Sequence, residues 1–101
     1  MGKKLAVEGD TVSQDYYHCP GCSGSGTYSV APVTLQTFVF ISGKLVIPDQ
    51  QGYGAHCGNS VNSSCLFVFI TGMGVVRDQD RASSSHDTSP LQAIGQGFVF
   101  A

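Results

Sequence analysis

A tripeptide, Phe-Val-Phe, occurs three times in this chain and constrains its fold more than any other feature. The three copies stand at residues 38–40, 67–69 and 98–100. The first two copies continue into Ile-[Ser/Thr]-Gly and a short apolar run that ends at Asp49 or Asp78, in each case 11 residues past the first Phe. The N-terminal segment GKKLAVEGD has the same form and ends at Asp10. Because self-similarity at a fixed period indicates a repeat architecture, we divide the chain into three units, at approximately 2–41, 42–70 and 71–101.

Each unit is predicted to be built from short β-strands rather than helices. The 101 residues suit one domain, 1–101, with a modest core. Only 12% of the residues are charged and 13 are Gly, which is typical of short strands joined by turns. Ser42-Gly43 and Thr71-Gly72 are predicted to turn each Phe-Val-Phe strand back into the next apolar strand. We therefore expect an all-β fold, a small three-sided cone or prism of β-hairpins built from three pseudo-threefold repeats.

The three histidines of the chain fall at the same place in the three units. Each follows the aspartate of its unit by 7 or 8 residues, and they are His18, His56 and His86. A single His in a small domain is usually a surface or core residue, but three that are related by a threefold axis can converge on that axis. Three imidazoles are a natural set of metal ligands. The spacing therefore predicts a metal near the apex, where the loops meet and the core narrows.

A cysteine is expected to complete this metal site. After its His, the first loop is about eight or nine residues longer than the other two, and this part of the chain contains HCPGC, residues 18–22. Cys22 is the preferred fourth ligand because the Pro-Gly turn lets it fold back, and Cys19 is the close alternative. Cys57 adjoins a histidine, which makes shared binding of one ion awkward, and Cys65 is predicted to be a small buried apolar residue. This ligand set favours one structural zinc per chain, with iron or copper tolerated.

The end of the prism opposite the histidines is predicted to be wide and to expose strand edges. An unpaired edge accepts a strand from another sheet. A base with pseudo-threefold symmetry matches a partner with true threefold symmetry. We therefore expect one copy of this chain on a trimeric partner, with the apolar strand ends as the contact.

Composition and local sequence argue against several other functions. The net charge of −2 gives no basis for binding nucleic acid or an anionic membrane. No apolar run approaches the roughly 20 residues needed to cross a bilayer, and the N-terminus lacks the apolar stretch of a signal peptide. Ser84-Ser85-His86-Asp87 contains Ser, His and Asp, but adjacent side chains diverge and do not form a triad. We expect no enzyme and no small-molecule substrate.

Two zinc-dependent alternatives stay open. A zinc-dependent hydrolase would need an open coordination position, which a site of three His without the Cys would provide. A zinc-binding interaction module for nucleic acid would need paired CxxC motifs and a basic surface. The chain has one CxxC, and five Lys and Arg against seven Asp and Glu.

Taken together, these features resemble the PAAR-repeat family. The resemblance rests on FVFISGKLVIPD, FVFITGMGVVRD and KLAVEGDTVS, on one His per loop and on the closing Phe-Val-Phe, and it covers essentially the whole chain. The tetrapeptide Pro-Ala-Ala-Arg that names the family is absent, and residues 45–48 and 74–77 stand in its place.

The resemblance implies a spike tip. Members of this family are small cones of β-hairpins with a zinc near the apex, and their base sits on the blunt end of a trimeric β-helical spike. By position, His18, His56 and His86 would be the apex ligands, with a Cys completing the set. The implied function is to cap and sharpen the central spike of a contractile injection machine that pierces a host outer membrane. The absence of a toxin-like segment favours a tip of the T-even-like phage tail baseplate, made in the host cytoplasm and carried in the virion, over the tip of a type VI secretion spike.

Overall fold

The described chain is built entirely from short strands and turns. The computed structural model describes residues 2–15, 25–53, 59–83 and 88–101, and these ranges contain no helix, which confirms the all-β prediction. Within them, accordingly, there is no helix that could span a bilayer. The strands are β1 (Thr11–Asp15), β2 (Ser25–Ser29), β3 (Phe40–Ile41), β4 (Lys44–Leu45), β5 (Gly52–Tyr53), β6 (Asn59–Val61), β7 (Phe69–Ile70), β8 (Met73–Gly74), β9 (Arg81–Ser83) and β10 (Thr88–Gln92).

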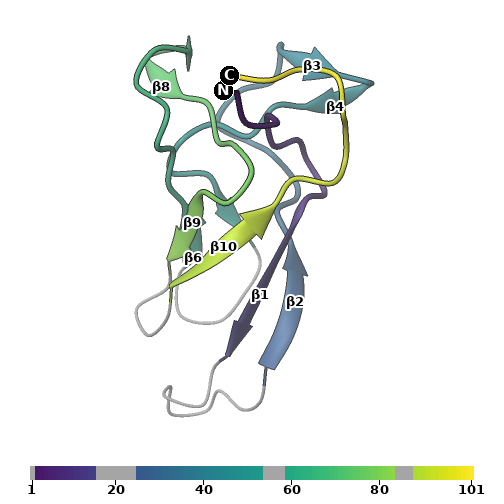
Figure 1. The fold of residues 1–101 in the computed structure, drawn as a ribbon, viewed down its shortest axis with the longest axis vertical. Coiled ribbons are helices and arrows are strands. Elements are labelled where there is room, and N and C mark those ends of the chain that lie inside the picture. The colour runs from purple at the N-terminus through teal and green to yellow at the C-terminus, as the bar shows by residue number, and fades with distance from the viewer. Residues whose placement is uncertain (1, 16–24, 54–58, 84–87) are drawn as a thin grey trace.

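Six of these strands form one antiparallel sheet that curls into a nearly closed barrel (Figure 1). Their order is β2-β1-β10-β9-β6-β5. The pairs β1–β2, β5–β6 and β9–β10 join strands that follow one another in the chain, whereas β1–β10 and β6–β9 join these hairpins to each other. The register places the C-terminal ends of β1, β5 and β9 at the same end of the sheet. We call this the apical end.

Two short hairpins lie at the opposite end of the molecule, which we call the base (Figure 1). β3 pairs with β4 and β7 with β8. The residues between the strands have positive φ, 54° and 76° at Ser42 and Gly43 and 49° and 79° at Thr71 and Gly72. Two such residues in succession define a type I′ turn, whose twist matches that of the flanking strands. The predicted turns at both positions are therefore confirmed.

A third pair of chain segments at the base is formed by residues from the two ends of the chain. The N–H of Lys3 donates to the carbonyl of Ala101 at 2.9 Å, and the N–H of Ala101 donates back to Lys3, also at 2.9 Å. An antiparallel bridge joins Lys4 to Phe100 beside this pair. Both chain ends consequently lie at the base, as Figure 1 shows.

Between the base and the sheet, three segments are joined by a closed ring of backbone hydrogen bonds. Ala6 N–H donates to the carbonyl of Val76 at 2.8 Å, Val76 donates to Ile47 at 2.9 Å, and Ile47 donates to Ala6 at 3.1 Å. All three side chains are fully buried. Each segment thus donates to one neighbour and accepts from the other, so three parts of the chain that are far apart in sequence surround one common line.

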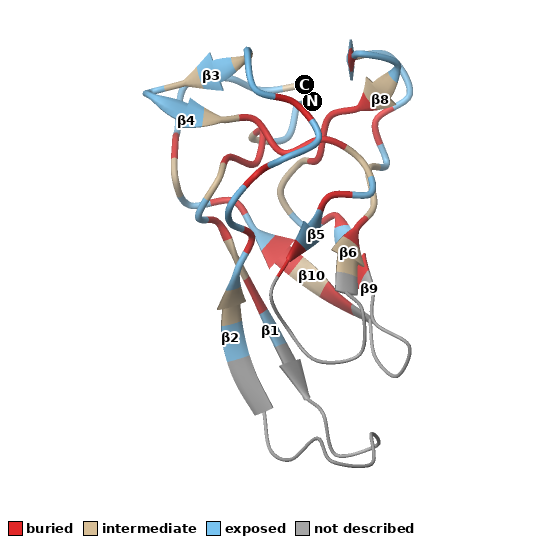
Figure 2. Cartoon of the chain, turned by 180° about the vertical axis from the view of Figure 1, so that it is seen from behind, coloured by how far each residue is buried: buried red, intermediate tan, exposed pale blue. Residues whose placement is uncertain are grey.

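The core follows that line through the molecule. Figure 2 shows the buried residues along the middle segments and on the sheet, and exposed residues on β3 and β4. The larger buried cluster comprises Ala6, Val12, Val30, Val33, Ile47, Tyr53, Val61, Val76, Ala82, Leu91 and Ala93. The smaller cluster, toward the base, comprises Leu5, Val7, Val46, Cys65, Ile70 and Val75. The molecule is elongated and nearly round in section, with principal extents of 38 × 24 × 24 Å.

Candidate docking face at the base

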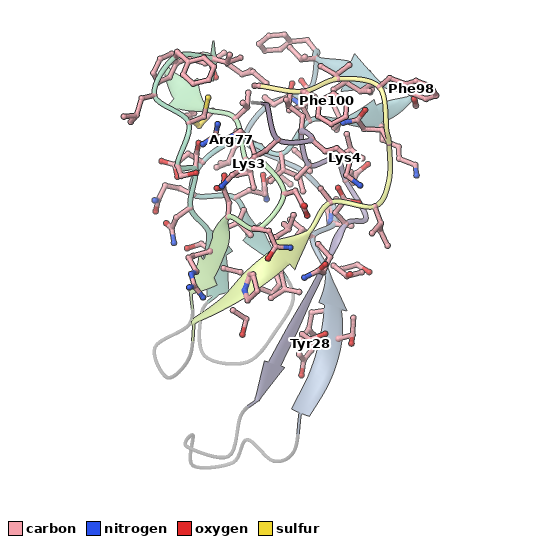
Figure 3. All side chains as sticks on the ribbon, viewed as in Figure 1. Lys3, Lys4, Tyr28, Arg77, Phe98 and Phe100 are labelled. Atoms are coloured by element: carbon pink, nitrogen blue, oxygen red, sulfur yellow. The ribbon has the colours of Figure 1, made fainter. Side chains whose placement is uncertain are left out.

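Every phenylalanine of the chain is exposed, and all belong to the segments that form the base. Their exposed fractions range from 54% to 82%, and the set, which we call the aromatic face, is Phe38, Phe40, Phe67, Phe69, Phe98 and Phe100. Figure 3 shows Phe98 and Phe100 at this end of the molecule. Between the rings, Val39 and Val68 turn inward and pack against the smaller buried cluster. Exposed apolar side chains gathered at one end of a small protein indicate a site of interaction.

A buried glutamine holds the backbone of the first Phe-Val-Phe segment. The amide oxygen of Gln36 accepts from the N–H groups of Phe38 at 3.0 Å and Val39 at 2.9 Å. The amide nitrogen donates to the carbonyls of Val39 at 3.0 Å and Val46 at 2.7 Å. One side chain therefore satisfies both the start of the strand and the segment beside it, which leaves the Phe rings to point outward.

Gln96 plays the same part for the third segment. Its oxygen accepts from Phe98 N–H at 2.6 Å and Val99 N–H at 2.8 Å. Its nitrogen donates to the carbonyls of Leu5 and Val99, both at 2.9 Å. The segments that carry the first and third pairs of rings are thus fixed by the same four contacts.

The backbone of the second Phe-Val-Phe segment is supported by a different side chain. The residue two positions before its first Phe is Cys65, which is 3% exposed and packs in the smaller buried cluster. Its predicted role as a small buried apolar residue is confirmed. The hydroxyl of Ser63 instead donates to the carbonyl of Val75 at 2.6 Å and accepts from the N–H of Cys65 at 3.0 Å.

The backbone beside the rings presents unpaired groups at the base. The hydrogen bonds of Lys3 with Ala101 and of Leu5 N–H with the carbonyl of Val99, at 3.1 Å, lie on either side of Phe100. In an antiparallel pair, hydrogen-bonded residues alternate with residues whose N–H and C=O point away. Phe100 is in the second position, and its backbone makes no hydrogen bond to another described residue. By the same alternation, Phe40 and Phe69 direct their N–H and C=O groups to the outer edges of β3 and β7.

The predicted metal ligands lie outside the described residues. This applies to His18, His56 and His86, to the preferred Cys22, and to the alternatives Cys19 and Cys57. The strand ends that flank these three stretches, from β1 and β2, β5 and β6, and β9 and β10, all lie at the apical end. Among the residues that the structure does describe, no group of three or more His, Cys, Asp or Glu could hold a metal. The metal site therefore stays a prediction.

The exposure of the six rings was not predicted from the sequence, although a contact at the apolar strand ends was. A signal for them was present in the alternation of the tripeptide itself. Side chains alternate between the two faces of a strand, so in Phe-Val-Phe either the two Phe or the one Val can face the core. A narrow core accommodates Val more easily than two rings, which predicts the arrangement of the first two segments; in the third segment Val99 is itself 39% exposed.

The chain was compared with family models, with curated proteins and with solved structures, and none of the three comparisons gives a match. The functional assignment therefore depends on the arrangement of the residues described above.

Proposed function

We propose that this protein is the tip of a spike in a contractile injection machine. One copy sits through its aromatic face on the blunt end of a trimeric β-helical spike protein, and the opposite end is drawn together by one metal ion. The protein thereby caps and sharpens the spike, which passes through a host outer membrane when the machine contracts. In this proposal the protein has no substrate and acts mechanically.

The threefold recurrence of contacts is the observation that carries this proposal. Each of three segments contributes two exposed Phe rings at the base, and the three segments that pair with them continue into Ala6, Ile47 and Val76, which close the ring of hydrogen bonds. A single chain with quasi-equivalent contacts around one line offers matching surfaces to three identical subunits. The elongated shape, with the apolar face at one end, supports placement at the end of a spike.

The strand edges at Phe40, Phe69 and Phe100 support the same kind of partner. Unpaired N–H and C=O groups on an edge strand are satisfied when a strand from another chain pairs with them. A β-helical end has such strands, so the base would continue the partner's sheets as well as bury the rings.

Metal content tests the apical half of the proposal. Protein purified without added metal should contain one zinc per chain, and His18→Ala, His56→Ala and His86→Ala should each lose it or bind it much more weakly. Cys22→Ser should weaken binding more than Cys19→Ser. A metal-free wild type, or loss of metal in only one histidine variant, would remove the single axial site from the proposal.

Particle composition tests the basal half. Particles purified from cells that produce this chain should contain one copy of it per spike trimer. The double variant Phe40→Ser/Phe69→Ser should be missing from the particles, whereas Thr27→Ala on β2 should be retained as the wild type is. Retention of the double variant would show that the aromatic face is not the contact.

A further inference from the structure

The charge of the whole chain differs in sign from the charge that the base presents. Seven Asp and Glu exceed five Lys and Arg, which gives the net charge of −2. Five of the acidic side chains are described, and none of the five is exposed. They are Glu8, Asp10, Asp49, Asp78 and Asp80.

Each of these five carboxylates is engaged by backbone N–H groups. Glu8 accepts from Val33 at 2.7 Å, Asp49 from Ser63 at 2.7 Å, and Asp78 from Ala93 at 2.9 Å. The two remaining carboxylates each accept from more than one backbone N–H. Their negative charge is therefore held in buried or partly buried contacts with the backbone, and none of it is carried by an exposed side chain.

The cations have the opposite distribution. Lys3 and Lys44 are exposed, and Lys4 and Arg77 are partly buried. Figure 3 shows Lys3, Lys4 and Arg77 in the half of the molecule that holds Phe98 and Phe100, and Lys44 begins strand β4 at the base. Among the described side chains, none of these four cations forms an ion pair with an Asp or Glu carboxylate. The guanidinium of Arg77 donates instead to the oxygen of Ala101 at 3.2 Å and to the hydroxyl of Ser64 at 2.8 Å.

Two of the four cations lie beside the rings, whereas the ammonium group of Lys44 donates to the carbonyl of Gly95 at 3.5 Å. Lys4 stands directly opposite Phe100 in the bridge between the chain ends. The guanidinium carbon of Arg77 is 5.8 Å from the centre of the Phe67 ring, within the range of a cation–π contact. The described surface of the base thus combines six exposed rings with four cations and no exposed Asp or Glu side chain.

We infer that the base selects a protein surface that has an apolar centre and carboxylates around it, and that its cations oppose pairing with a second copy of the chain. This inference rests on the proposed function for the threefold shape of the partner and adds its charge. Complementary charges steer association, and like charges placed face to face disfavour it. A lipid surface could accommodate the rings in its hydrocarbon and the cations among its headgroups. It offers no hydrogen-bond partners to the strand edges beside the rings, because a hydrocarbon interior has no hydrogen-bonding groups.

A charge-reversed copy of the chain provides the probe for this inference. The variant Lys3→Glu/Lys4→Glu/Lys44→Glu keeps all six rings and surrounds them with carboxylates. Sedimentation velocity at about 10 mM salt, where the Debye length is about 30 Å, would compare wild type alone, variant alone and an equal mixture. We expect each protein alone to remain monomeric over the concentrations at which the mixture forms a one-to-one complex. The mixture should associate at a concentration at least about tenfold below that at which either protein alone self-associates, a free-energy difference of about 1.4 kcal/mol.

Three controls assign the effect to the aromatic face. The preference for the mixed complex should vanish at about 1 M salt, where the Debye length is about 3 Å. Arg81→Glu, which reverses an exposed cation on β9, should form no complex with the wild type. Adding Phe40→Ser/Phe69→Ser to the charge-reversed variant should abolish the complex. Circular dichroism and thermal unfolding establish that each variant is folded.

Two results would overturn the inference. One is a mixture that associates no more than its separate components at low salt. The other is wild-type protein that does not bind the charge-reversed copy but does bind vesicles made from equal amounts of phosphatidylcholine and phosphatidylserine. That result would indicate that the aromatic face binds an anionic membrane. Neither result depends on the apical metal, so this inference can fail while the metal test of the proposed function succeeds.

Discussion

The segments that present the first and third pairs of rings are held differently from the segment that presents the second. Gln36 and Gln96 each make four hydrogen bonds to backbone groups. Around Cys65 the hydroxyl of Ser63 makes two. The path of the chain is similar in all three places, although its polar support is not.

This difference shows that the geometry of the base requires side-chain hydrogen bonds to a few backbone groups, and that more than one residue type can make them. An amide carries both a donor and an acceptor, so it can bridge two strands. A hydroxyl with a buried thiol nearby can satisfy the same carbonyl, provided that the neighbouring backbone approaches closely. Gly74 permits this approach, because a Cβ there would lie 2.8 Å from the Ser63 hydroxyl and 3.0 Å from the carbonyl oxygen of Cys65.

The largest effect is expected when the amide bridge is removed. Gln96→Leu leaves Phe98 N–H, Val99 N–H and the carbonyl of Leu5 without their partners. Each unsatisfied buried group costs about 1–3 kcal/mol, so the free energy of unfolding should fall by about 3–5 kcal/mol. Urea unfolding measures this loss, with Gln92→Leu at an exposed position as the control. A loss below about 1 kcal/mol would mean that water replaces the amide.

The next effect is expected from crowding the second segment. Gly74→Ala forces its new methyl group against Ser63 and the backbone of Cys65. Overpacking of this kind costs about 1–3 kcal/mol. The matched control is Gly97→Ala, since a Cβ there meets no atom within 4 Å. Similar stabilities for the two variants would show that the second segment moves aside freely.

A somewhat smaller effect is expected from Ser63→Ala. The carbonyl of Val75 and the N–H of Cys65 lose the hydroxyl that joins them, which should lower the unfolding free energy by about 1–2 kcal/mol. The cost of Gly74→Ala should also be lower in the Ser63→Ala background, because the closest atom is gone. A double-mutant cycle on the two positions measures that coupling. Strict additivity would contradict the proposed competition for space.

The smallest effect is expected at the thiol. Cys65→Ala removes only the sulfur from a packed site, at a cost of about 1 kcal/mol. Because Cys65 packs in the buried cluster near the base, we also expect the metal content to stay unchanged in this variant. Thermal unfolding and metal analysis of the same sample check both points. A loss of metal would mean that Cys65 contributes to the site after all.

Sequence reasoning predicted the elements that local chemistry determines. Gly43 and Gly72, each placed between a Phe-Val-Phe strand and the next apolar run, indicated the turns, and the low charge with many Gly indicated strands. The supporting contacts of the base could not be predicted in this way. Gln36 and Gln96 are polar residues next to exposed rings, and only the folded arrangement brings buried carbonyls to them.

The alignment of the N-terminal segment was also out of register. The sequence suggested that Asp10 corresponds to Asp49 and Asp78, each of which accepts from a backbone N–H two residues past a buried strand residue. In the N-terminal segment, the carboxylate that makes the corresponding contact, with the N–H of Val33, belongs to Glu8. Asp10 instead shares its contacts with Asp80, since each accepts from a backbone N–H three residues earlier in the chain. A Glu side chain is one methylene longer than an Asp side chain but carries the same charge, so Glu8 can make the contact that Asp makes elsewhere. Aligning Asp with Asp therefore placed the N-terminal segment in the wrong register. The interval from the matching carboxylate to His18 is then 10 residues.

The closed ring of hydrogen bonds among Ala6, Ile47 and Val76 has a consequence for how the protein forms. The ring of hydrogen bonds cannot close until residue 76 is present. The carboxylate of Asp10 likewise cannot complete its hydrogen bonds until Ile94 and Gly95 are present to donate their N–H groups. Contacts that span most of the chain carry a high entropic cost before they are made, and they slow folding. The chain should therefore fold in one late, cooperative step after nearly all of it has been synthesised, and shorter nascent chains should remain open to proteolysis.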